Sequence, residues 1–179
     1  SGFYRTTLLP SPGSPATERA AAVADHWAQV LAGRVGHGSF LELAGSLADD
    51  TDLGVWQAIL GGLSTLDVLA PGRFAGPAAE ILGPPIERLG WEASPADDDR
   101  SRQLRGLVLA AGGTVAAVDH VIAGARALWD TPIDDPAVAT AVVVVVSAHG
   151  DADAYAECRE RARRAETAQV EQRHLRALT

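Results

Sequence analysis

Apolar and polar residues follow one another along this chain with the period of amphipathic helices. Between residues 17 and 32 the apolar positions are spaced i, i+4, i+7 and i+8, which is one face of a helix with about 3.6 residues per turn. This face comprises Val23, Trp27, Val30 and Leu31. Gly33 ends the pattern, because glycine readily adopts the positive φ common at helix ends. The pattern predicts a helix over about 16–32, capped by Ser14 with Pro15 at its first position.

A second helix is expected over about 39–49 and a third over about 52–69. Ser39 and Glu42 have the spacing of a capping box, in which each side chain bonds the other residue's free backbone N–H. Gly61 and Gly62 lie inside the third helix, where each costs about 1 kcal/mol relative to alanine. We therefore expect this helix either to bend at the glycines or to be crossed closely by another helix.

Six further helices are expected, over about 73–89, 97–111, 115–129, 137–149, 152–165 and 167–178. Pro84 and Pro85 should kink the first of these or divide it into two short helices, because proline lacks the N–H that a helix interior uses. Gly112 and Gly113 are expected to end the second, and Thr114 to cap the third.

The sequence 137–150 contains five consecutive valines, Val142 to Val146. β-Branched residues favour a strand. However, the Asp135-Pro136 start, the Gly150 stop and the helical neighbours favour a helix, since a buried helix can be apolar on all sides. We predict a helix here.

The last two helices are each expected to bury one face. The buried positions predicted for them are Tyr155, Cys158, Ala162 and Ala165, followed by Val170, His174, Leu175 and Leu178. On the outer face, two glutamate–arginine pairs have i, i+4 spacing, which is typical of a solvated helix surface. These pairs are Glu157 with Arg161 and Glu160 with Arg164.

Two helices joined by a short turn cannot bury both apolar faces alone, and stacking further pairs beside them is the usual solution. The sequence therefore predicts an all-α fold over 16–179, a right-handed array of helical hairpins forming an α-α superhelix of the HEAT or armadillo kind. Residues 1–10 suit a short extended strand, and 11–15 (SPGSP) suit a linker. Because this strand has no partner in a helical array, we expect 1–15 to be the end of a preceding β-domain plus linker. We also expect the array to be truncated at its C-terminal end.

Composition and charge narrow the possible partners. The 179 residues are 47% hydrophobic, which is enough for one domain with a substantial core. A net charge of −8 argues against nucleic acid and gives no support to an anionic membrane surface. The longest apolar run, 137–148, is too short to span a bilayer. The single cysteine, Cys158, excludes an internal disulfide and suits a cytoplasmic setting.

No residue of this chain is predicted to be catalytic, cofactor-binding or metal-binding. The five histidines are His26, His37, His120, His149 and His174. No two of them are spaced i, i+4, so the chain has no His-Glu-x-x-His zinc motif, and no Cys–His spacing replaces it. There is also no P-loop, no Gly-x-Ser-x-Gly elbow and no dinucleotide fingerprint.

Three other groups of residues could be mistaken for functional sites. Asp97, Asp98 and Asp99 suggest a metal cluster, but helix capping explains them better. Gly33, Gly36 and Gly38 lie in a helix–helix turn, where a phosphate loop is not expected. Cys158 lies on an inward helix face, which favours a structural thiol over a nucleophile.

Several short motifs occur in a specific order: GFYR at 2–5, ERAAAVADHWAQVLAGRVGHGSFLELAGSL at 18–47, VW at 55–56, LGW at 89–91 and LR at 104–105. Together they resemble the C-terminal helical region of zinc aminopeptidases of the aminopeptidase-N and puromycin-sensitive type. AETAQVEQRHLRAL at 165–178 is loosely similar to a helix of that family. The resemblance covers almost the entire chain.

The resemblance implies a non-catalytic helical domain that covers the substrate cavity of a zinc metallo-aminopeptidase. Its catalytic domain, with the zinc site, would lie N-terminal to residue 1, and its partners would be the rest of that enzyme and the peptide substrate. Arg105 matches a family position, and we expect it to be structural. The alternative is a free-standing helical-repeat scaffold for protein–protein interaction. A third hypothesis, an unrecognised small enzyme, would need a pocket with perturbed titratable groups.

Overall fold

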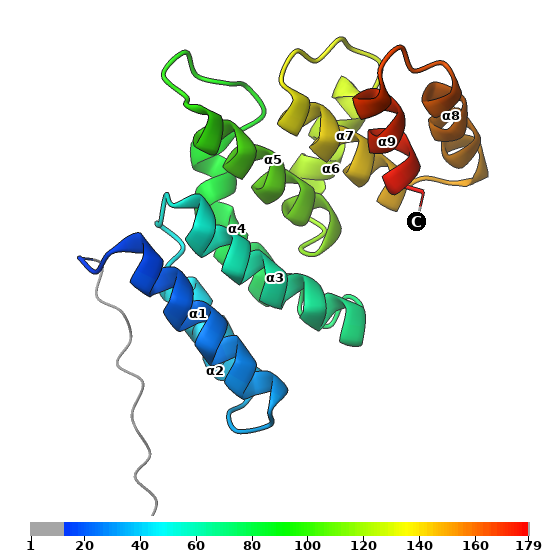
Figure 1. Cartoon of the computed structure of the whole chain (residues 1–179). Coiled ribbons are helices and arrows are strands. Elements are labelled where there is room, and N and C mark those ends of the chain that lie inside the picture. Colours follow the sequence, from blue (N-terminus) through cyan, green and yellow to red (C-terminus); the bar gives the residue numbers. More distant parts are fainter. Residues whose placement is uncertain (1–12, 179) are drawn as a thin grey trace, which may run out of the picture.

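The computed structural model describes residues 13–178, which form helices and connecting loops without a strand (Figure 1). The helices in this range are α1 (Ala16–Leu31), α2 (His37–Ser46), α3 (Leu53–Leu69), α4 (Ala75–Leu89), α5 (Asp99–Thr114), α6 (Asp119–Leu128), α7 (Pro136–Ala148), α8 (Ala152–Arg163) and α9 (Ala168–Arg176). The all-α prediction is confirmed. The strand expected over 1–10 lies outside the described residues.

Neighbouring helices form two rows. In one row α1 packs on α3, α3 on α5, and α5 on α7, so these helices follow one another across the molecule (Figure 1). In the other row α2 packs on α1 and α4, α4 on α5, and α6 on α7, while α8 and α9 pair at the C-terminal end. Helical hairpins packed side by side in this way are consistent with the predicted α-superhelix.

The core is centred on α1 to α5. Phe40, Trp56 and Ile59 are all completely buried there. The centres of the Phe40 and Trp27 rings are 4.9 Å apart. The Trp56 Nε1–H donates to the carbonyl oxygen of Asp50 at 2.7 Å, so the indole is buried with its polar atom satisfied. Each of these large side chains contributes about 1.5–3 kcal/mol through burial.

A glycine of α3 makes room for a large side chain of α2. A Cβ on Gly62 would lie 2.2 Å from Cζ of Phe40, whereas a Cβ on Gly61 would have nothing within 4 Å. Gly62 thus leaves room for the Phe40 ring of α2, while Gly61 faces open space. Because α2 packs mainly on α1 and α4, the close helix crossing expected at the glycine pair is not confirmed.

Short polar side chains begin most of the later helices, including the predicted starts at the three aspartates and at Asp135. Asp52, Asp98, Asp135, Asp151 and Thr167 are N-caps whose side chains accept hydrogen bonds from backbone N–H groups of the first turn. The cap at Asp135 starts α7, which contains the valine run. The helix prediction for 142–146 is therefore confirmed over the competing strand propensity.

The predicted caps of α1 and α2 are wrong. Helix α1 has Pro15 at its N-cap, one residue later than expected, and α2 begins at His37 with Gly36 as its N-cap. Because Ser39 lies inside the helix, no capping box forms with Glu42. The Ser39 Oγ instead donates to the Gly36 carbonyl oxygen at 2.7 Å and lies 2.9 Å from Nε2 of His26.

Helix α4 is one helix through Pro84 and Pro85. Of the two outcomes expected for these prolines, a kink or a division into two short helices, the division is wrong. The buried side chains of Ile81, Leu82 and Ile86 flank the prolines on both sides. Packing of this apolar face holds the helix together despite the missing N–H groups.

Helix α5 does not end at Gly112 and Gly113 but continues to Thr114. These glycines serve close packing: a Cβ on Gly113 would lie 2.4 Å from Cγ2 of Val145 in α7. Thr114 donates its hydroxyl to the Ala110 carbonyl oxygen at 2.8 Å and does not cap α6. The chain turns three residues later, where Ala117 adopts a φ of 50°.

The last two helices bury fewer residues than predicted. Cys158, Ala162 and His174 are buried as expected, whereas Tyr155 is 52% and Leu175 is 45% exposed. Helix α8 contacts α7 and α9 along the stripe that contains Cys158 and Ala162, and Tyr155 lies outside this stripe. The difference arises because helical period locates an apolar stripe but not how wide the covering surface is.

Candidate functional site

The three consecutive aspartates of the α4–α5 connection form a helix start. Asp98 accepts from the Ser101 N–H at 2.8 Å, and this hydrogen bond lowers the pKa of its carboxyl. Asp97 accepts from Nη2 of Arg105 at 2.5 Å, which likewise lowers the pKa of Asp97. Between residues 13 and 178, no group of three or more His, Cys, Asp or Glu side chains is placed to hold a metal ion.

Arg105 joins α4 to α5. Its side chain is only 2% exposed, and its Nε donates to the Leu89 carbonyl oxygen at the end of α4 at 3.0 Å. With the Asp97 ion pair, these bonds fix the loop that carries Trp91 against both helices. The expected structural role is consistent with these contacts. Its partner Asp97 was not predicted, because the sequence assigned all three aspartates to capping.

A second such pair was missed altogether. Nε of Arg19 in α1 lies 2.6 Å from Oδ2 of Asp50, and the Asp50 carboxylate is 6% exposed. Burial acts to raise the pKa of Asp50, but the hydrogen bonds from Arg19 and the Asp52 N–H outweigh it and lower the pKa. The two residues are 31 positions apart, so no local sequence pattern could have indicated the pair.

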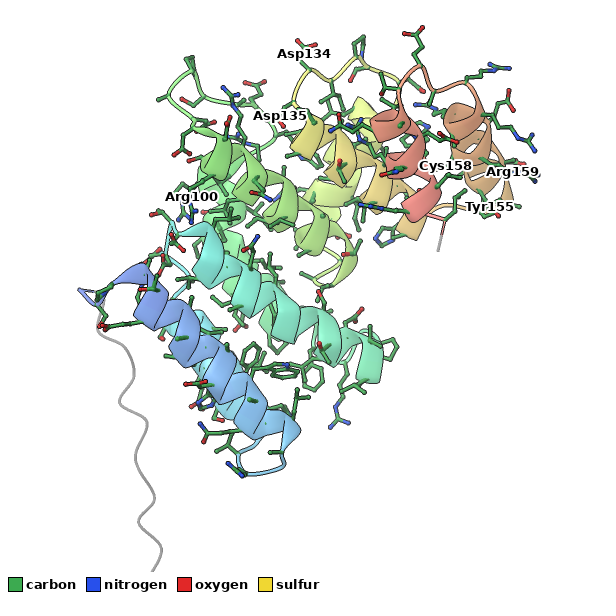
Figure 2. The ribbon with its side chains drawn as sticks, in the orientation of Figure 1. Arg100, Asp134, Asp135, Tyr155, Cys158 and Arg159 are labelled. Carbon is green, nitrogen blue, oxygen red and sulfur yellow. The ribbon has the colours of Figure 1, made fainter. Side chains whose placement is uncertain are left out.

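Cys158 is completely buried between α8 and α9, and Figure 2 labels it there. Its thiol donates to the carbonyl oxygen of His174 at 3.4 Å, and Ser147 Oγ lies 3.8 Å from the sulfur. Burial raises the pKa of this thiol. A nucleophilic cysteine needs an exposed, readily ionised thiol, so the geometry fits the predicted structural role.

The histidines do not come together in one site. His26 lies against Ser39, His37 contacts the ring of Phe74 edge-on, and Nε2 of His149 lies 2.6 Å from the Gly113 carbonyl oxygen. These contacts join different pairs of helices. These three imidazoles thus have separate local contacts, and His120 is exposed on α6.

A hollow of about 280 Å³ lies between α2 and α4. Its lining is apolar at Leu41, Pro77 and Ile81, and the exposed glutamates Glu42 and Glu80 lie beside them. An apolar surface flanked by two carboxylates suits a cationic or amphipathic peptide side chain.

No single helix within residues 13–178 is long and apolar enough to cross a membrane. Helices α5 and α6 reach that length and apolarity only when they are taken together, and they are bent by 115° at the break between them.

The fold and its contacts define a helical-repeat domain whose polar clusters cap helices or connect neighbouring helices through hydrogen bonds and ion pairs. Residues 5–179 match the family described as the ERAP1-like C-terminal domain, and the chain belongs to this family. It is therefore a non-catalytic domain of an aminopeptidase of the aminopeptidase-N family, as the resemblance implied. No curated protein matches the chain. The family match does not favour the alternative of a free-standing scaffold.

Proposed function

We propose that this domain is the helical lid of a zinc aminopeptidase, which shapes the substrate cavity and limits the access of peptides to it. The observation that carries the proposal is the family match, which extends over residues 5–179. The peptide substrate and the remaining domains of the parent enzyme are its partners in this proposal.

Zinc belongs to the catalytic domain in this account. The side chains of residues 13–178 do not provide a group suited to a metal, and the sequence has no His-Glu-x-x-His motif. This domain's own residues would therefore act by contact with peptide and with neighbouring domains, while the bond cleavage occurs elsewhere.

The hollow between α2 and α4 is the surface that we assign to peptide contact. Glu42 and Glu80 supply negative charge, and neither forms an ion pair with another residue among those described. A basic side chain of a long peptide could pair with them while the N-terminal end of the peptide is in the catalytic domain. A substrate of one residue would be too short to reach both places.

The test compares short and long substrates in the full-length enzyme. In the variant Glu42→Lys/Glu80→Lys, we expect several-fold lower kcat/KM for a long basic peptide and unchanged kcat/KM for a single-residue amide. Asp25→Lys is the control, because it reverses an exposed charge on α1, away from the hollow. Equal effects on both substrates, or equal effects of the control, would refute the assignment.

A further inference from the structure

A second cavity lies at the other end of the molecule, where the loop between α6 and α7 meets α7, α8 and α9. Its volume is about 140 Å³. Apolar residues on one side are Ile133, Val142 and Val143, and Trp129 also lines the cavity. Arg173 and His174 of α9 contribute the polar side. None of these residues has a role in the proposed lid surface.

One of the two arginines at this cavity is fully neutralised. Nη2 of Arg161 lies 2.5 Å from Asp130 Oδ1 and 2.5 Å from Glu157 Oε1. Its guanidinium also lies 4.1 Å from the centre of the Trp129 ring and donates to the Trp129 carbonyl oxygen at 2.7 Å. With two carboxylates and an aromatic face as partners, Arg161 has no charge left to offer a ligand.

Arg173 is different. No carboxylate within residues 13–178 pairs with its guanidinium, and its Nε is buried without a hydrogen-bond acceptor. Burial lowers the pKa of Arg173, and no acidic neighbour opposes that effect. An uncompensated, partly buried cation costs free energy. A ligand that supplied one negative charge would remove this cost.

His174 borders the same cavity. Its Nδ1 lies 2.9 Å from the Val170 carbonyl oxygen, and because a carbonyl only accepts, Nδ1 carries the proton. In the neutral ring Nε2 then has only a lone pair, so it can accept a hydrogen bond but cannot donate one to a carboxylate. The ring lies edge-on to Trp129, with 6.4 Å between ring centres, so the imidazole has a fixed orientation beside the cavity.

We propose that this cavity binds a short aliphatic monocarboxylate, with the carboxylate on Arg173 and the alkyl chain against Ile133, Val142 and Val143. A single uncompensated cation selects a single negative charge. A volume of about 140 Å³ has room for a small organic acid such as propionate. A glutamate side chain ends in the same CH2–CH2–carboxylate group. The source is therefore either a free acid or an acidic side chain of another protein segment.

The test uses the 179-residue chain labelled with 15N and follows the indole N–H signal of Trp129, which borders the cavity. Propionate should produce a saturable shift, and propionamide, which has the same shape without the charge, should not. N-acetylglutamate N-methylamide distinguishes the sources: saturable binding indicates an acidic side chain, and binding of propionate alone indicates a free acid.

Arg173→Gln should weaken propionate at least tenfold. Arg159→Gln is the matched control, because Arg159 is an exposed arginine on α8 (Figure 2) and should leave binding unchanged. The proposal is overturned if propionamide binds as well as propionate, if inorganic phosphate binds more tightly, if the two variants behave alike, or if none of the probes gives a saturable shift. The propionamide comparison needs no variant, so it remains decisive even if Arg173→Gln impairs folding.

Discussion

Two adjacent glycines of α3 should respond to the same substitution with opposite signs. Gly61→Ala adds a methyl group where nothing lies within 4 Å, so only the helix propensity changes. That change favours alanine by about 1 kcal/mol. For a domain of this length, 1 kcal/mol corresponds to about 2–4 °C in Tm. Gly61→Ala should therefore raise Tm by about that amount.

Gly62→Ala gains the same propensity but places its Cβ 2.2 Å from Cζ of Phe40. Ordinary carbon contacts are about 3.5–4.0 Å, so the ring or the helix must move by more than 1 Å in a fully buried region. Overpacking of this kind costs about 1–3 kcal/mol. A contact this short and this buried belongs at the upper end, which leaves a net loss of about 1–2 kcal/mol.

Thermal and urea unfolding of the two variants and the native chain measure both effects. Phe40→Leu provides a further check, because shortening the ring should make Gly62→Ala less costly than it is in the native chain. If both alanines raised Tm equally, the Phe40 ring would not pack on Gly62 as closely as described. If both alanines lowered Tm, the description of Gly61 as having open space around it would be wrong.

Three further predictions concern caps, pH and the thiol. Asp135→Ala should destabilise the chain by about 1 kcal/mol through loss of the α7 cap, and Asp135→Ser should recover most of it; equal urea midpoints for Ala and Ser would contradict the cap. The folded pKa of Asp50 is lowered, so its contribution is complete above the unfolded pKa of about 3.9 and is lost as pH falls through the folded value. Asp50→Asn should abolish that acid-side loss, and a variant with the native pH profile of unfolding would refute the role of the Arg19 pair. Cys158 should react with a thiol reagent far more slowly in buffer than in urea, and equal rates would show that it is not buried.

Helix existence could be predicted from the sequence because it depends on local information. The period of apolar residues located all of the helices within the described range, and the Asp135-Pro136 start was enough to decide α7 against its valine propensity. Caps formed by Asp98 and Asp151 were also accessible, since an N-cap acts on backbone groups two or three residues away.

The errors occurred where a distant residue decides the outcome. Gly113 looks like a helix stop until Val145 is known to pack against it, and Ser39 looks like a cap until α2 is seen to start earlier. The missed ion pair of Arg19 with Asp50 has the same cause, because a pair 31 positions apart leaves no local pattern. Arg173 was missed as a candidate site because only the three-dimensional structure shows which arginines already have carboxylate partners.

The most direct test of the central claim is to sequence the gene upstream of the codon for Ser1. If this domain is the lid of a zinc aminopeptidase, the same reading frame must encode a His-Glu-x-x-His motif with a later glutamate ligand, followed by a β-rich segment that continues into GFYR at residues 2–5. An upstream reading frame without that motif would contradict the account.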